Sequence, residues 1–176
     1  KEGQRALRFM QAAGTAVVAG VTPGKGGQAV DGVPVYNTVA EALDVHPDIT
    51  ISCAYVPPKF APDAVEESIL GGIELVHVFA EGIPTLETAR LLELAKQHEA
   101  RILGPSSVGL MRPGRYSLGT IGGGDMDAYL PATESLPGVA ILSKSGGMAH
   151  TVADMMTRAD VPQSLVVGIG GDRFVG

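Results

Sequence analysis

The segment ITISCAYVPPKFAPDAVEESILGGIELVHVF (residues 49–79) contains two short β-rich runs on either side of a helical pattern. Ile49–Val56 and Leu75–Phe79 are mostly apolar and partly β-branched, whereas Ala61–Gly71 has the apolar spacing of a helix. A strand, a crossover helix and a second strand form a βαβ unit, in which the two strands are parallel. The segment therefore predicts an α/β fold built on a parallel sheet.

The same alternation continues on both sides of this segment. Further strands are predicted at Thr15–Gly20, Arg101–Leu103, Val139–Leu142 and Leu165–Ile169, and further helices at Gln4–Ala13, Thr38–Leu43, Pro84–His98 and Gly147–Arg158. The short connections indicate a doubly wound sheet with its ligand loops at the strand ends. Because the chain opens in a helical pattern and stops just after a strand, we expect the first strand of the sheet to be missing and the chain to be truncated at both ends.

A stretch rich in glycine and proline, residues 104–137, interrupts this alternation. Such composition is typical of a linker, and we place a domain boundary within it. The predicted organisation is a first domain at residues 1–118, a linker at 119–136 and the beginning of a second domain at 137–176.

Composition argues against several classes of function. The formal net charge of −6 at pH 7, without any run of Lys and Arg, argues against a nucleic-acid partner. The apolar stretches are too short to cross a membrane, so we expect a cytoplasmic protein, or one of the mitochondrial matrix if the source is eukaryotic. Cys53 is the single cysteine and is expected to be a buried structural thiol, and no spacing of the four histidines predicts a metal site.

Two glycine-containing segments are candidate anion sites. GVTPGKGG (residues 20–27) follows a strand and carries Lys25 among glycines that allow close backbone approach, although an ordinary surface turn explains it equally well. SKSGG (residues 143–147) lies between a strand and a helix, where free N–H groups favour an anion, and a plain Ser/Gly N-cap is the alternative. His150, one turn into that helix, is the histidine nearest to a candidate site.

Seven motifs together resemble the alpha subunit of succinyl-CoA synthetase, within the NDP-forming acid-CoA ligases. They occur in order along the chain: GVTPGKGG (20–27), GVPVYNTVAEA (32–42), YVPP (55–58), AEGIP (80–84), GPSSVG (104–109), SKSGGM (143–148) and GIGGD (168–172). The resemblance implies a Rossmann-like domain that binds coenzyme A, followed by the start of a flavodoxin-like ligase domain.

The resemblance also implies roles for individual residues. Matched to the family, the cofactor-binding positions are Lys1, Glu2, Lys25, Val56, Pro57, Phe79, Ala80 and Glu81, and the phosphate-binding positions are Ser145, Gly146 and Gly147. The family's phosphorylated histidine lies beyond Gly176, so no catalytic residue is expected in this chain, which alone should be inactive. NTP and Mg²⁺ are expected at a beta-type, ATP-grasp partner subunit or region.

The implied reaction makes an acyl-CoA thioester from a small carboxylic acid, CoA and NTP through a phosphohistidine, as in the tricarboxylic acid cycle. Succinate is the preferred acid. Gly147-Met148 and Asp172-Arg173-Phe174 resemble ATP-citrate lyase and citryl-CoA synthetase, which are the alternative. A non-catalytic CoA-binding module is a second alternative. A third is an NAD-dependent dehydrogenase, which the absence of an intact G-x-G-x-x-G disfavours.

Overall fold

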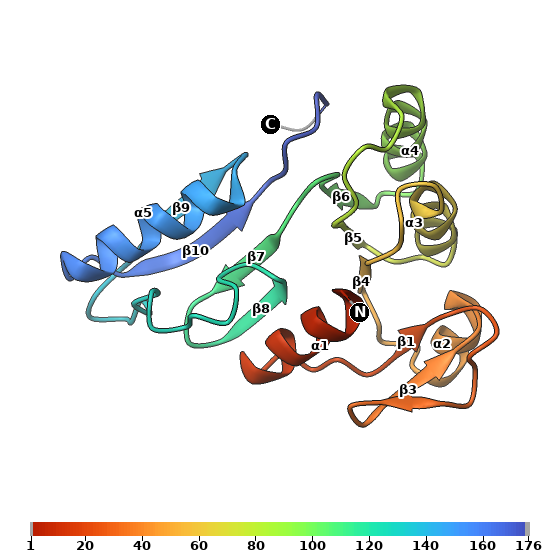
Figure 1. The fold of residues 1–176 in the computed structure, drawn as a ribbon, viewed down its shortest axis with the longest axis horizontal. Coiled ribbons are helices and arrows are strands. Elements are labelled where there is room, and N and C mark those ends of the chain that lie inside the picture. Colours follow the sequence, from red (N-terminus) through yellow and green to blue (C-terminus); the bar gives the residue numbers. More distant parts are fainter. Residues whose placement is uncertain (1, 175–176) are drawn as a thin grey trace.

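The computed structural model describes residues 2–174 as an α/β protein with three small sheets (Figure 1). The helices are α1 (Glu2–Ala12), α2 (Val39–Val45), α3 (Ala61–Leu70), α4 (Thr85–Gln97) and α5 (Gly146–Arg158). The strands are β1 (Gly20–Val21), β2 (Ala29–Val30), β3 (Val33–Tyr36), β4 (Ile51–Ala54), β5 (Leu75–Val78), β6 (Arg101–Leu103), β7 (Gly109–Arg112), β8 (Tyr116–Gly119), β9 (Val139–Ser143) and β10 (Gln163–Gly168).

The predicted βαβ unit forms the central sheet, in the order β4-β5-β6 with all strands parallel. Alternate side chains of β5 point to opposite faces, as the period of a strand requires. Val76 and Val78 pack with α3 and α4 in a core that includes Val65, Ile69 and Leu91. The sheet and the two helices therefore form one layered unit, and Figure 1 shows both helices on the same side of the strands.

The opposite face of the central sheet packs against α1 and the hairpin of β7 and β8. Ala6 and Met10 of α1 and Leu118 of β8 are buried together, with Cys53 and Tyr55 packed against them. Burial raises the pKa of the Cys53 thiol to about 12. Cys53 is partly buried, and the raised pKa of its thiol disfavours the nucleophilic thiolate.

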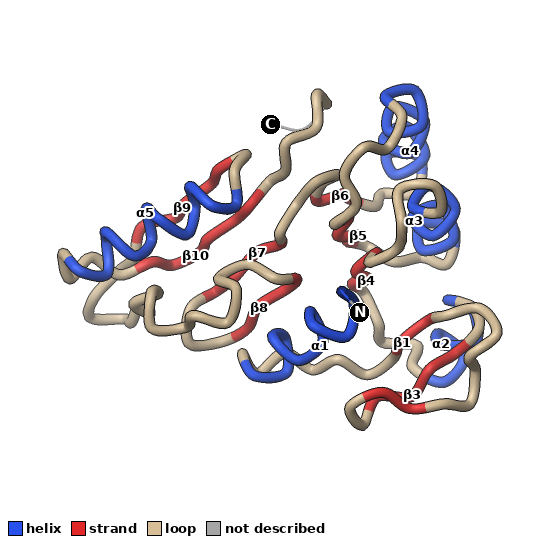
Figure 2. Tube along the Cα trace, viewed as in Figure 1, coloured by secondary structure: helices blue, strands red, loops and turns tan. Residues whose placement is uncertain are grey.

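The strand predicted at Thr15–Gly20 forms only at its end. β1 contributes two residues to a ladder with β3, and no backbone hydrogen bond involves Ala16–Ala19 within the described residues. β4 pairs only with β5, so its other edge is also open among those residues. A ladder needs a neighbouring strand. Within the described residues, no strand lies between the open edge of β1 and the open edge of β4, so these two strands belong to separate small sheets (Figure 2).

The second part of the chain contains strands that the glycine and proline content of residues 104–137 did not suggest. β7 and β8 form an antiparallel hairpin, and β7 pairs antiparallel with β10, which is parallel to β9. Pro113 and Gly114 (φ +71°) occupy the turn between β7 and β8, closed by Arg115 N–H donating to Arg112 O at 3.0 Å. The hairpin thus joins the sheet that α5 covers, and the proposed division near residues 119–136 stays a prediction.

Candidate functional site

The carboxyl ends of β4 and β5 lie side by side because the two strands are parallel and paired. Tyr55, directly after β4, stacks on Phe79, directly after β5, with ring centroids 4.8 Å apart. A Cβ on Gly3, in the first turn of α1, would lie 3.3 Å from Tyr55 Cβ. The fold therefore brings the segments of Glu2, Val56–Pro57 and Phe79–Glu81 to one edge, as the strand-end motifs predicted; Lys1 lies outside the described residues.

The residues at this edge differ in accessibility. Glu2, Pro57 and Glu81 are exposed, Val56 and Phe79 are half-buried, and Ala80 is buried. Ala80 O accepts a hydrogen bond from Ser106 N–H at 2.9 Å. The side chain of Ala80 can therefore offer little to a ligand, and this segment would contact a ligand through its exposed neighbours and backbone.

Lys25 lies on a second loop, which follows β1 and is built from two successive turns. Lys25 N–H donates to Thr22 O, and Gln28 N–H donates to Lys25 O. The N–H groups of Gly24 and Gly26 both donate to Asn37 Oδ1 at 3.0 Å. The backbone donors of this loop are thus already used, and the free feature is the exposed Lys25 ammonium, which pairs with no carboxylate among the described residues.

The close fit of this loop to Asn37 explains one of its glycines. A Cβ on Gly26 would lie 2.7 Å from Asn37 Cγ, which is shorter than van der Waals contact. Asn37 is itself held by Glu41, whose Oε2 accepts from Asn37 N–H at 2.8 Å. The geometry of the Lys25 loop therefore depends on Asn37. Sequence reasoning did not single out Asn37, because the glycines that it contacts are more than ten residues away in the sequence.

Ser145, Gly146 and Gly147 form the start of α5, as the SKSGG motif predicted. Ser145 is the N-cap, and its hydroxyl oxygen accepts a hydrogen bond from Met148 N–H at 3.3 Å. The N–H groups of Gly146 and Gly147 have no acceptor among the described residues. No acidic side chain lies in the first turn of this 13-residue helix, so no carboxylate there neutralises its positive end. That end therefore offers two free N–H donors.

A loop connects the two candidate sites. Ser107 N–H donates to Val78 O at the end of β5, and Ser107 Oγ donates to Gly168 O at the end of β10 at 2.6 Å. His77 Nε2 donates to Ser107 O at 3.0 Å, and burial lowers the pKa of His77 to about 4. Val108 packs directly on Gly146, where an added Cβ would lie 2.8 Å from Val108 Cγ1. The loop at residues 104–109 therefore links the β5 strand end to the start of α5.

A cavity of about 260 Å³ adjoins the start of α5. Its wall is formed by Val108, Thr120, Ile121, Gly122, Gly123, Gly146, Gly147 and His150. His150 Nδ1 lies 2.9 Å from the hydroxyl oxygen of Tyr129. The contribution of Thr120–Gly123 could not be predicted, because these residues belong to the stretch taken as a linker.

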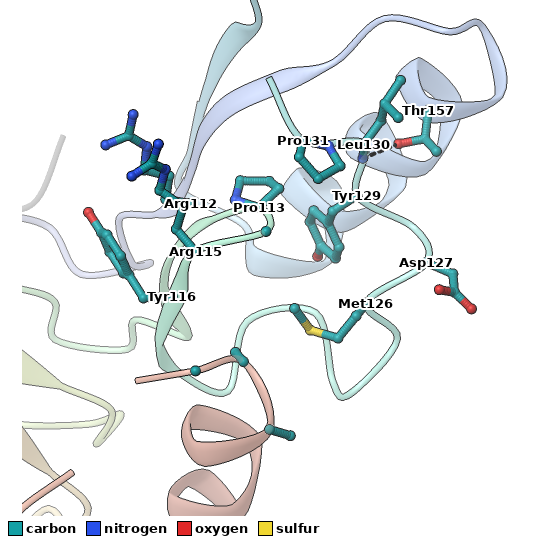
Figure 3. A pocket seen from close by; sticks show the side chains of 14 residues that line it. Arg112, Pro113, Arg115, Tyr116, Met126, Asp127, Tyr129, Leu130, Pro131 and Thr157 are labelled. Atoms are coloured by element: carbon teal, nitrogen blue, oxygen red, sulfur yellow. Dashed lines mark hydrogen bonds between the residues drawn. The ribbon is translucent and has the colours of Figure 1, made fainter. Parts of the chain in front are cut away.

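A larger cleft of about 630 Å³ lies between the end of α1, the β7–β8 turn and residues 126–131 (Figure 3). Figure 3 shows Arg112 and Arg115 on one side of it, Tyr129 and Met126 near its middle, and Asp127 on the far side. None of the predicted site residues lines this cleft. The cleft therefore contains none of those residues, although one of its lining residues, Tyr129, contacts His150 of α5.

Across residues 2–174, His, Cys, Asp and Glu side chains form no group of three or more that could hold a metal ion. Within the same range, no helix combines the length and the apolar character needed to cross a membrane.

These features define an α/β protein with a Rossmann-like parallel sheet and a mixed sheet whose strand β9 leads into the glycine-rich start of α5. Residues 1–82 match the family described as CoA binding domain. Over most of its length the chain is similar to alpha subunits of ADP-forming acid-CoA ligases.

The relatives and a solved structure agree with this assignment. The chain is 41% identical over 164 residues, 93% of its length, to succinate–CoA ligase [ADP-forming] subunit alpha 2 of Archaeoglobus fulgidus, of which it covers 54%. It is 38% identical over 171 residues, 95% of its length, to malate–CoA ligase subunit alpha of Methylorubrum extorquens, of which it covers 55%. The chain thus spans about half the length of these curated relatives.

ATP citrate lyase from Methanothrix soehngenii, solved in complex with citrate and coenzyme A, has a similar fold. The TM-score is 0.78 at 24% identity, over 98% of this chain and 30% of that one. At this identity the likeness concerns the fold.

Proposed function

We propose that this chain is the CoA-binding part of an alpha-type subunit of an NDP-forming acid-CoA ligase, which forms an acyl-CoA thioester from a carboxylic acid, CoA and NTP. The observation that carries the proposal is the pairing of two sites through one loop. The strand-end edge supplies Glu2 with the segments Val56–Pro57 and Phe79–Glu81, and the separate loop after β1 supplies Lys25. The α5 start supplies Ser145–Gly147, and Ser107 hydrogen-bonds to both β5 and β10.

The strand-end edge and the Lys25 loop together have the chemistry that CoA needs. CoA carries phosphates, and the free ammonium group of Lys25 can pair with one of them, since charge-assisted hydrogen bonds are among the strongest. The exposed backbone after β4 and β5 can receive the rest of an elongated ligand, because parallel sheets bind ligands at the carboxyl ends of their strands. Under this proposal the division into domains at 1–118 and 137–176 separates the CoA site from the phosphate site.

The start of α5 has the chemistry that a phosphoryl group needs. Two free N–H groups at the positive end of a helix stabilise negative charge without any covalent step. We propose that the phosphohistidine comes from a segment outside this chain, and that NTP and Mg²⁺ bind at a beta-type partner. The chain alone would then bind CoA without catalysis.

The acid substrate is proposed to be succinate, with citrate as the alternative. The related ligase subunits carry the names of both succinate and malate at nearly the same identity, so identity alone does not select the acid. The residues that touch the acid would decide it.

Gly147 is the position at which to test the phosphate site. Gly146 packs on Val108, so a larger side chain there would also disturb the fold, whereas a Cβ on Gly147 meets only Ser145 Oγ, at 3.9 Å. In the complete enzyme with its partner, Gly147→Val should slow labelling of the enzyme by γ-labelled nucleotide in a single turnover and leave CoA affinity unchanged. Labelling at the wild-type rate would show that SKSGG is only an N-cap.

A further inference from the structure

His150 presents its imidazole to the cavity beside the start of α5. It lies three and four residues after Gly147 and Gly146, the spacing that places residues on the same face of a helix. All three line the same cavity of about 260 Å³. The imidazole and the two glycines therefore border the same cavity.

Tyr129 is the hydrogen-bond partner of His150 Nδ1. Tyr129 is 4% exposed, and burial raises its pKa to about 12, so the phenol keeps its proton. The only described partner of its hydroxyl group is His150 Nδ1, at 2.9 Å. A Tyr hydroxyl group can donate or accept; when the Tyr129 phenol donates, Nδ1 accepts and Nε2 carries the hydrogen.

We propose that His150 donates a hydrogen bond from Nε2 to a phosphoryl oxygen held at the start of α5, and that Tyr129 is a positioning residue that maintains this tautomer. The inference rests on the proposed phosphate site at Ser145–Gly147 and adds the residue that completes it. Nε2 has no partner among the described residues.

A phosphoryl group suits this cavity because the polar groups at its α5 wall are donors. They are Gly146 N–H, Gly147 N–H and His150 Nε2–H, and the first turn of α5 contains no carboxylate. A ligand with several acceptor oxygens on one centre can receive all three hydrogen bonds at once.

The test uses inorganic phosphate and the ¹⁵N-labelled chain. Long-range ¹H–¹⁵N spectra of the histidine rings report the tautomer of His150, and the Gly147 amide signal reports phosphate binding. We expect the Nε2–H form, and a phosphate affinity about tenfold weaker in His150→Phe, as for a charge-assisted hydrogen bond. His150→Gln, which keeps a side-chain N–H donor, should recover part of the affinity.

Tyr129→Phe separates positioning from folding. It should leave the helix content unchanged, convert His150 to a mixture of tautomers and weaken phosphate binding several-fold. His98→Phe, at the end of α4, is the matched control and should change neither readout.

The outcomes distinguish this inference from the proposed function. A wild-type Nδ1–H form, or equal phosphate affinity in wild type and His150→Phe, would overturn the role of His150 and leave the phosphate site intact. If phosphate fails to shift the Gly147 signal in the wild type, the phosphate site and the role of His150 both fall. CoA binding is measured separately and is unaffected by either result.

Discussion

Gly146→Ala is expected to destabilise the protein, although replacing glycine with alanine normally favours a helix. Gly146 opens α5 against Val108, and the added methyl group would lie 2.8 Å from Val108 Cγ1 and closer still to Cγ2. Overpacking of this kind costs about 1–3 kcal/mol. Gly147→Ala is the matched control, because its methyl group meets no atom closer than 3.9 Å and should stabilise by up to about 1 kcal/mol.

The assay is urea unfolding followed by far-ultraviolet circular dichroism, since the chain contains no tryptophan. Val108→Ala removes the two methyl groups that clash. As a single substitution it should lower the free energy of unfolding, whereas in the Gly146→Ala background it should raise it. The double-mutant cycle should show a coupling free energy of about 0.5–3 kcal/mol. Equal stability of Gly146→Ala and Gly147→Ala, or strictly additive effects of the pair, would refute the contact between the 104–109 loop and α5.

Three further predictions concern buried groups at the centre of the molecule. Ser107→Ala should lower the free energy of unfolding by about 1–3 kcal/mol in urea, because Gly168 O and Gly109 N–H lose their partner. Ser106→Ala is the control and should have little effect, since no hydrogen bond of the Ser106 side chain is described. His77, with its pKa lowered to about 4, charges more easily when unfolded, so up to about 3 kcal/mol of stability present above pH 6.5 should be lost as the pH falls toward 4. Urea unfolding from pH 7 to 4 should show a smaller loss in His77→Gln, and an equal loss would contradict the assignment. Cys53 should resist a thiol reagent at pH 8 until urea unfolds the chain, and rapid labelling of the native protein would contradict its raised pKa.

The parallel sheet and its helices could be predicted because their signals are local. Ala61–Leu70 and the strands around it carry their own periodicity, and Ser145 caps α5 where the motif indicates. The hairpin of β7 and β8 also had a signal, the Pro113–Gly114 turn between apolar runs. The glycine and proline content around it obscured that signal.

The features of the candidate sites that could not be predicted depend on contacts between residues far apart in the sequence. Asn37 takes the amide donors of the Lys25 loop, and Val108 fills the space above Gly146. Such contacts leave no periodic pattern, so sequence reasoning could offer the Lys25 loop as a candidate anion site or a surface turn but could not show that its amide donors are already used. The structure leaves the exposed Lys25 ammonium as the charged group of that loop.

Calorimetric titration of CoA against this protein and its Lys25→Ala variant tests the central claim most directly. The lysine contact should contribute ~1–3 kcal/mol, a loss of affinity of about 5- to 150-fold in the variant. Lys96→Ala, in the last turn of α4, is the control and should bind CoA as the wild type does. Unchanged affinity in Lys25→Ala, or tighter binding of NAD than of CoA by the wild type, would contradict the account.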